Sequence, residues 1–395
     1  MGEKTHSRCT LTIWLWHRLS PSGLPFWVYP YQVLAMQSNS EMMLKRLIYT
    51  LLLLPIACIE PYKVDVPEGE QLLIVEGTIT SGAGPHAVTL TKSATYGSDF
   101  EGLIRPVQRA TVALKDDQGN TVLLTESQTA KGTYYTEANY HAEIGRSYTL
   151  LIELSDGKLY SSIPQKVVAV PELQNLTARS VVIEQDGGAS PVSGIQIIAQ
   201  VDDPAEENNY YFWRNASSMY ILETRPDLYR PPATDANPNP PVTPKPCCIS
   251  CFRTEIPDNR SIFLESDDNF NGLTTNIPVA YIEDDGKRFV NKFRIDVKQL
   301  GISQDAYRFL RLVQQQTETS GSIFDPPPAT IRGNVVSLDN PEEVVLGYFI
   351  AAGESIKRIY VEPADLTFHQ NRAIIPDDCL TVEGTTTIPP ADWNR

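Results

Sequence analysis

The feature that most constrains the fold is a series of short apolar runs, each ended by turn-forming residues. Between the runs 111–114 and 121–124, for example, lies Asp-Asp-Gln-Gly-Asn, a group that tolerates the left-handed backbone of a tight hairpin. These runs are too short for helices, and the chain's 30 prolines and 23 glycines also favour strands and turns. The strands predicted in this first region are 72–77, 87–90, 111–114, 121–124, 132–135, 148–154 and 158–162.

Strands that recur at this spacing with no helical stretch between them predict an antiparallel β-sandwich at 72–170. Gly145 and Tyr148 place a tyrosine shortly after a turn, as immunoglobulin-like and transthyretin-like modules do. We therefore expect a mainly β chain that begins with an immunoglobulin-like or transthyretin-like sandwich.

A larger β-rich domain is predicted at 171–363, followed by a polar C-terminal tail at 364–395. We interpret the aromatic run 210–213 as a buried strand, because aromatic side chains favour strands on packing grounds. The eight prolines of 226–246 cannot support a continuous strand ladder, so this stretch is predicted to be an extended surface loop. The other strands predicted here are 195–201, 331–338, 344–351 and 356–361.

One helix is predicted, at 303–317. Ser303 is a suitable N-cap, and the following residues place apolar side chains on one face. That apolar stripe consists of Ala306, Phe309, Leu310 and Val313.

The first 57 residues end in a segment organised like an export leader. Two basic residues precede the apolar run 47–57, whose eleven residues are too few to span a bilayer, which needs about 20. We interpret 42–57 as a lipoprotein signal peptide. Translation is then expected to start at Met42 or Met43, which makes 1–41 a misassigned start.

The sequence Leu-Pro-Ile-Ala-Cys at 54–58 resembles a lipobox, the recognition site of the lipoprotein signal peptidase. Small Ala57 fits the position before the cut, whereas Pro55 stands where leucine is usual. This match predicts cleavage before Cys58 and a lipid on that cysteine, which anchors the chain to a membrane. The alternative is a buried cysteine after an apolar strand. Residues 58–71 are predicted to be a short polar tether.

Four further cysteines are candidates for disulfide bonds in an oxidising compartment: Cys247, Cys248, Cys251 and Cys379. Four cysteines allow three pairings. Cys248-x-x-Cys251 also fits half of a zinc site, but no second pair completes it, so disulfides are favoured. A bridge from this cluster to Cys379 would close a loop of more than 100 residues. The chain-entropy model assigns such a loop roughly 4–5 kcal/mol.

The usual catalytic signatures are absent from the sequence, which has no GxSxG elbow, HExxH motif, Walker loop or dinucleotide glycine fingerprint. The histidines beyond the leader, His86, His141 and His369, are isolated from one another. We therefore expect no enzymatic activity and no cofactor. The net charge of −15, with no basic cluster to offset it, argues against nucleic-acid binding.

One segment fits half of a calcium loop. Asp267, Asn269 and Asn271 alternate before Gly272, so three side-chain oxygens are spaced to converge on a cation. The position of the closing glutamate is occupied by Pro278, and an ordinary turn is therefore favoured.

Several segments together resemble one family. These are 72–77 after the lipobox, Tyr-Arg-Phe at 307–309, Gly-Ser-Ile-Phe-Asp-Pro-Pro-Pro at 321–328, Gly-Asn at 333–334 and Leu-Gly-Tyr-Phe at 346–349. Their order and spacing resemble the domain-of-unknown-function 4249 family over about 58–393, and 321–334 is the most specific part. In the tail, a single Cys379 precedes Gly384, where the family pattern has a cysteine cluster. The segment 321–334 is interpreted as a packed structural loop, with a rim that contacts a partner barrel as the alternative.

The resemblance implies a location and a partner. Members of the family look like outer-membrane lipoproteins of bacteria rich in TonB-dependent receptors. The leading hypothesis is a non-catalytic, lipid-anchored accessory to a TonB-dependent outer-membrane transporter, which captures or gates substrate at either membrane face. The alternative is a structural or adhesion lipoprotein of the cell surface, and a third hypothesis is a hydrolase whose site cannot be read from sequence.

Overall fold

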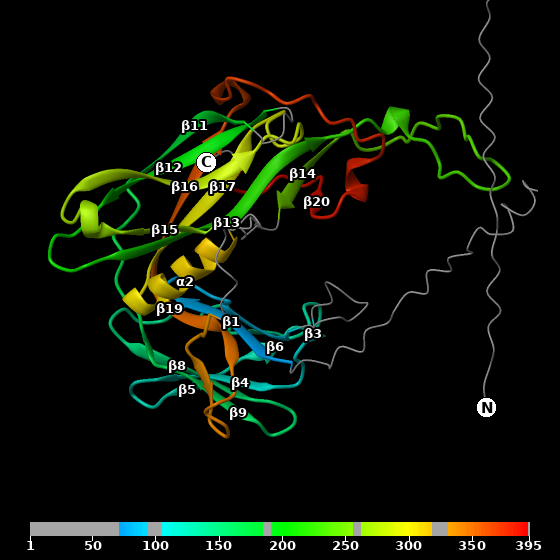
Figure 1. Ribbon diagram of the computed structural model, residues 1–395. Helices are drawn as coiled ribbons and strands as arrows, with labels where there is room; N and C mark the ends of the chain where they lie inside the picture. Colours follow the sequence, from blue (N-terminus) through cyan, green and yellow to red (C-terminus); the bar gives the residue numbers. More distant parts are fainter. Residues whose placement is uncertain (1–70, 94–104, 185–190, 256–261, 318–330, 394–395) are drawn as a thin grey trace, which may run out of the picture. The chain divides into compact units, whose positions relative to one another are not determined.

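Strands dominate the computed structural model, which describes residues 71–93, 105–184, 191–255, 262–317 and 331–393 (Figure 1). All of these belong to one unit, Val66–Arg395. Within them α2 (Gln304–Thr317) is the one α-helix, and the mainly β, sandwich-like fold is confirmed. The predicted signal peptide 42–57, Cys58 and the motif residues 321–328 lie outside the described residues.

The first sandwich holds its core between two sheets. Its first layer contains β1 (Leu73–Thr80), β2 (Ala87–Lys92), β3 (Arg105–Pro106), β6 (Thr125–Glu126) and β7 (Thr133–Tyr135). Its second layer contains β4 (Thr111–Asp116), β5 (Thr121–Leu123), β8 (Ser147–Glu153), β9 (Leu159–Ser162), β10 (Gln165–Lys166) and β18 (Val335–Ser337). Val75 and Leu90 from the first layer meet Leu114 and Leu150 from the second, all of them buried. Tyr148 stabilises the turn that precedes β8. Its Oη accepts a hydrogen bond from the backbone N–H of Glu143.

The second sandwich packs a three-stranded sheet against one end of the large, 11-stranded sheet. The small sheet contains β11 (Asn175–Ile183), β12 (Val192–Asp202) and β16 (Thr274–Glu283). The facing strands of the large sheet are β13 (Tyr210–Glu223) and β17 (Phe293–Gly301), and β14 (Ser250–Glu255), β15 (Phe263–Ser266) and β20 (Thr385–Thr386) extend it beyond β13. The aromatic run 210–213 lies in a strand, as predicted, with Tyr210 half-buried and the other three residues buried. Tyr211 and Trp213 point into the second core, whereas Phe212 lies in a third cluster on the other face.

A single strand, β19 (Val345–Val361), joins the two sandwiches (Figure 1). Its first half pairs in parallel with β1, and its second half pairs antiparallel with β17. The sequence predicted two strands here, at 344–351 and 356–361, and the structure has one strand of 17 residues. Because β18 and the first half of β19 complete the core of the first sandwich, the predicted range 171–363 contributes to both cores.

Two of the segments that carry the family resemblance, 333–334 and 346–349, meet on β19. Gly347 has φ +84°, and a Cβ there would lie 2.1 Å from the Val75 carbonyl oxygen, so the parallel pairing with β1 requires glycine. On the other edge of β19 the buried Asn334 side chain forms the hydrogen bonds that the backbone of a neighbouring strand would form. Its Nδ2 donates to the Phe349 carbonyl, and its Oδ1 accepts from the Phe349 N–H, both at 2.8 Å.

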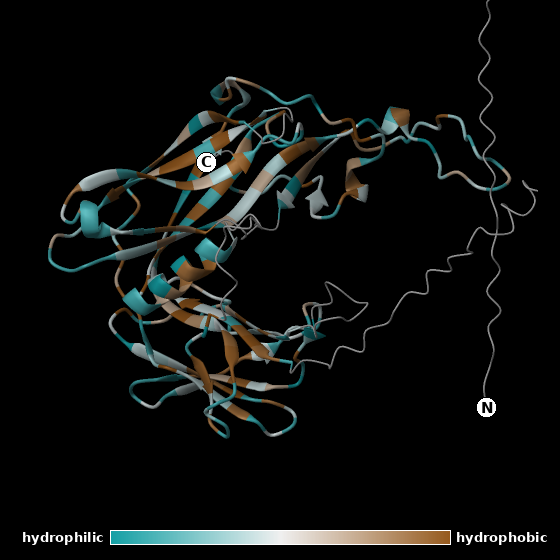
Figure 2. Cartoon of the chain, viewed as in Figure 1, coloured by the Kyte–Doolittle hydropathy of each residue, from teal (hydrophilic) through white to brown (hydrophobic). Residues whose placement is uncertain are grey.

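Helix α2 covers the face of the large sheet opposite the second core. Ser303 Oγ accepts a hydrogen bond from Ala306 N, so Ser303 caps the helix as predicted. Ala306 is buried against Leu300 and Ile350, and Phe309 and Leu310 pack beside them. Hydrophobic and hydrophilic bands alternate along α2 in Figure 2, consistent with a helix that buries one face.

The proline-rich stretch leaves β13 as a long loop that projects from the sheet (Figure 1). Only the short 3-10 turn Pro226–Leu228 and one isolated bridge interrupt it before β14, which agrees with the predicted extended loop. Thr243 N donates to Tyr229 O, and the Lys245 ammonium lies 4.0 Å from the centre of the Tyr229 ring. These contacts close the base of the loop beside Cys247.

Candidate functional site

The main candidate site is a groove of about 1300 Å³ that is lined by α2, by strands of the large sheet and by β16 of the small sheet. Its floor uses side chains that project from neighbouring strands, among them Ile74 on β1, Tyr348 on β19 and Phe212 on β13. Phe309 and Val313 of α2 form one wall. Residues i and i+2 of a strand project from the same face. The alternation that directs one set of side chains into a core therefore directs the other set, of mixed character, toward the groove.

Polar side chains of β13 also line the groove. Residues 210–213 pair with β15 and residues 218–223 pair with β14, so among the described residues 214–217 have no partner on that side. Arg214, Asn215 and Ser218 are the polar residues of β13 that line the groove.

Arg214 is a half-buried cation among the polar and apolar side chains that line the groove. Its guanidinium lies 5.6 Å from the centre of the Phe212 ring, and within the described part of the chain no carboxylate is at ion-pair distance. Burial lowers the pKa of Arg214, and the nearby Glu76 charge partly offsets that effect. Across the strand pair it faces Lys298, whose ammonium is already paired with Glu354 at 2.7 Å. A partly desolvated cation without an ion-pair partner is costly, and an anion supplied from outside would offset that cost.

The far end of the groove is polar. Arg288 forms an ion pair with Glu255 at 2.9 Å, and Arg253 donates to the Tyr220 hydroxyl at 2.8 Å. The Nε of Arg253 is buried and has no hydrogen-bond partner among the described residues. Burial opposes the charge of Arg288, but the hydrogen bond and ion pair with Glu255 outweigh it and raise its pKa.

Sequence reasoning did not identify this groove. Arg214 directly follows the aromatic run 210–213, and on an ideal strand it shares a face with Phe212. The signal that could have indicated the groove was Arg214, a charged residue at a position that continues the apolar face of the strand. The strands that surround it are separated by more than 100 residues in the sequence, as Ile74 and Tyr348 show, so no local pattern could bring them together.

The residues of the predicted calcium loop differ in burial. Asp267 is fully buried and its Oδ2 accepts a hydrogen bond from Asn209 N at 2.7 Å, whereas Asn269 and Asn271 are exposed. Burial raises the pKa of Asp267, with a further contribution from the charge of Asp203. Gly272 has φ +74°, as the predicted turn requires. The segment thus packs as a turn that inserts one carboxylate into the protein.

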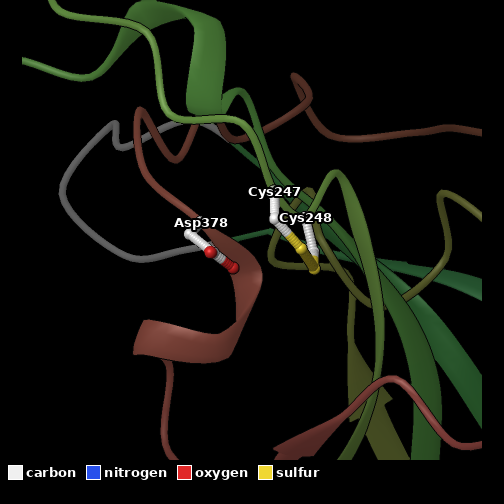
Figure 3. A group of neighbouring side chains, drawn as sticks. All are labelled: Cys247, Cys248 and Asp378. Atoms are coloured by element: carbon white, nitrogen blue, oxygen red, sulfur yellow. A yellow bond between two sulfur atoms is a disulfide. The ribbon is translucent and has the colours of Figure 1, made fainter.

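The four predicted disulfide cysteines are all gathered beside the base of the proline-rich loop. Cys251 of β14 is bonded to Cys379, 128 residues later, and both are fully buried. Cys247 is bonded to its neighbour Cys248. The bridge from the cluster to Cys379 therefore links β14 to the C-terminal segment. Figure 3 shows the Asp378 side chain directed toward the Cys247–Cys248 pair.

The three histidines remain apart. His141 and His369 are exposed, and His86 is buried with its Nε2 lacking a hydrogen-bond partner in the described residues. Burial lowers the pKa of His86, and the charge of Lys298 lowers it further. Both effects favour the neutral form of the imidazole.

No helix in the described ranges is long and apolar enough to cross a membrane. The family model described as "Domain of unknown function (DUF4249)" matches residues 59–358 of the chain. No curated protein matches the chain significantly. The matched range begins one residue after Cys58 and ends within β19, so it takes in the first core, most of the second core and most residues that line the groove.

Proposed function

The chain belongs to the family described as Domain of unknown function (DUF4249), and from that premise we propose that it is a lipid-anchored envelope protein that captures a ligand for a TonB-dependent outer-membrane transporter. The ligand occupies the groove between α2 and the large sheet. Its chemical class is an apolar or aromatic body with one anionic group, and the protein carries out no reaction on it.

The proposed location follows from the leader. Basic residues, an eleven-residue apolar run and the lipobox-like 54–58 occur in the order that an exported lipoprotein requires. The lipid on Cys58 is the membrane anchor. Residues 58–71 then connect that anchor to β1, whose own residues Ile74, Glu76 and Thr78 line the groove.

The single observation that carries ligand capture is the position of Arg214 in the groove. The walls offer aromatic and aliphatic surface, which favours an apolar ligand body. The guanidinium of Arg214, which has no carboxylate at ion-pair distance in the described residues, favours an anionic group on the same ligand.

The groove is tested with 8-anilinonaphthalene-1-sulfonate, a probe that combines aromatic rings with a sulfonate. We expect saturable binding to the folded protein, measured by fluorescence titration. Arg214→Gln should weaken binding at least tenfold, a loss of about 1.4 kcal/mol, because one charge-assisted hydrogen-bonding group is removed. Arg308→Gln is the matched control, since Arg308 is an exposed arginine on α2 that pairs with Asp305. Equal affinities for the two variants would contradict the role of Arg214.

The partner is tested by affinity purification from detergent-solubilised envelopes, followed by quantitative mass spectrometry. We expect a TonB-dependent barrel to be recovered with the wild-type chain. With Cys58→Ala its recovery should fall, because the unanchored chain leaves the membrane surface. Recovery of no outer-membrane barrel with the wild-type chain would refute the transporter role.

A further inference from the structure

Cys247, Cys248 and Asp378 form a group of potential metal ligands (Figure 3). Their ligand atoms, two Sγ and one carboxylate oxygen, all lie within 4.8 Å of one another. In the part of the chain that the structure describes, this is the one such group of three. It lies outside the groove, and it does not depend on the proposed function.

We propose that the Cys247–Cys248 pair is a redox-gated metal site, which in its reduced form binds a thiophilic divalent cation such as Zn²⁺ together with Asp378. Two thiolates and one carboxylate are ligands that zinc accepts, and water completes a tetrahedral set. In the disulfide form neither sulfur is a thiolate, so the site binds no metal.

The Cys247–Cys248 disulfide is more accessible to a reductant than the Cys251–Cys379 disulfide, so it is reduced first. Cys247 is exposed and Cys248 is half-buried, whereas Cys251 and Cys379 of the second bridge are 1% and 0% exposed. A dithiol reductant therefore reaches the Cys247–Cys248 bond while the buried bridge stays closed.

The buried bridge keeps the ligands together after reduction. Cys379 is bonded to Cys251, and its backbone N–H donates to the Cys248 carbonyl at 3.1 Å, so Asp378 remains beside the pair. Leu380 N donates to Asp378 Oδ1 at 2.9 Å, which orients this carboxylate as the N-cap of a short 3-10 turn. The third ligand is thus held by backbone contacts that do not involve the Cys247–Cys248 bond.

The chemistry balances with a dithiol as the reductant. Thiol–disulfide exchange transfers two electrons and two protons from the dithiol to the pair, so the Cys247–Cys248 bond breaks and the reductant forms its own disulfide. Binding of the cation then displaces the two thiol protons to solvent. A disulfide oxidant accepts two electrons from the two thiolates and is reduced to two thiols, so the Cys247–Cys248 bond re-forms and the metal is released.

The test titrates Cd²⁺, a spectroscopic substitute for Zn²⁺, into the full chain before and after treatment with a dithiol that is removed by gel filtration. Reduced wild-type protein should bind one equivalent and develop a thiolate-to-cadmium absorption band, and oxidised protein should develop none. Cys247→Ser should abolish the band. Asp378→Asn should weaken affinity at least tenfold.

Asp377→Asn is the matched control, because Asp377 carries the same charge one residue away but is paired with Lys245. Its affinity should stay within about twofold of wild type. Differential alkylation with peptide mapping records which bridge opened. No band after reduction of the pair, equal affinity for Asp378→Asn and Asp377→Asn, or opening of Cys251–Cys379 before Cys247–Cys248 would each overturn the proposal.

Discussion

Replacing Asn334 with alanine tests the two hydrogen bonds that its side chain makes to the edge of β19. The side chain is 3% exposed, and it makes two hydrogen bonds of 2.8 Å to the N–H and C=O of Phe349. Alanine leaves both backbone groups buried without this partner, and each such group costs about 1–3 kcal/mol. The expected loss in the free energy of unfolding is therefore roughly 2–6 kcal/mol, a large share of the about 5–15 kcal/mol typical of a domain.

The assay is urea unfolding at 25 °C, followed by fluorescence of the buried Trp213 and Trp393 and by circular dichroism. Asn334→Asp is the sharper variant, because a carboxylate still accepts from Phe349 N–H but opposes the Phe349 carbonyl, so it should destabilise at least as much as alanine. Asn340→Ala, at an exposed turn, should change the free energy of unfolding by less than about 0.5 kcal/mol. A loss below about 1 kcal/mol for Asn334→Ala, with an unchanged m value, would refute the reasoning.

Three further predictions concern the rest of the fold. Gly347→Ala should prevent the parallel β1–β19 pairing, seen as loss of the cooperative unfolding transition, because its Cβ would lie 2.1 Å from the Val75 carbonyl oxygen; a variant as stable as wild type would contradict this. Removing the Cys251–Cys379 bridge with paired alanines should cost about 3–5 kcal/mol, since the closed loop spans 128 residues, and an unchanged midpoint in urea would count against it. Because burial, aided by the Lys298 charge, lowers the pKa of His86, the unfolded chain binds more protons. Stability should therefore fall as the pH drops below about 6.5, and His86→Gln should flatten that dependence in urea midpoints measured from pH 5 to 7.5.

Much of the local structure follows from periodicity and turn chemistry. The hairpin between β4 and β5 has Gly119 at φ +92°, in the Asp-Asp-Gln-Gly-Asn group that predicted it. The capped and amphipathic helix appears one residue inside its predicted start. In both cases the determining contacts lie within a few residues, so a single sequence contains the necessary information.

Long-range pairing was not predictable in the same way. β1 pairs with β19, which begins at Val345 about 270 residues later, and only that pairing shows why Gly347 must be glycine. Strands as short as β10 or β20, with two residues each, carry no recognisable period. The groove depends on the same distant pairings, so the sequence contained Arg214 without indicating what surrounds it.

The most direct measurement of the central claim is the mass of the N-terminal peptide of the native protein, extracted from the membrane fraction. Our account predicts that the chain begins at Cys58 and that this peptide carries a thioether-linked lipid. A chain that retains 42–57, or one that begins elsewhere with an unmodified Cys58 and leaves the membrane without detergent, would contradict it.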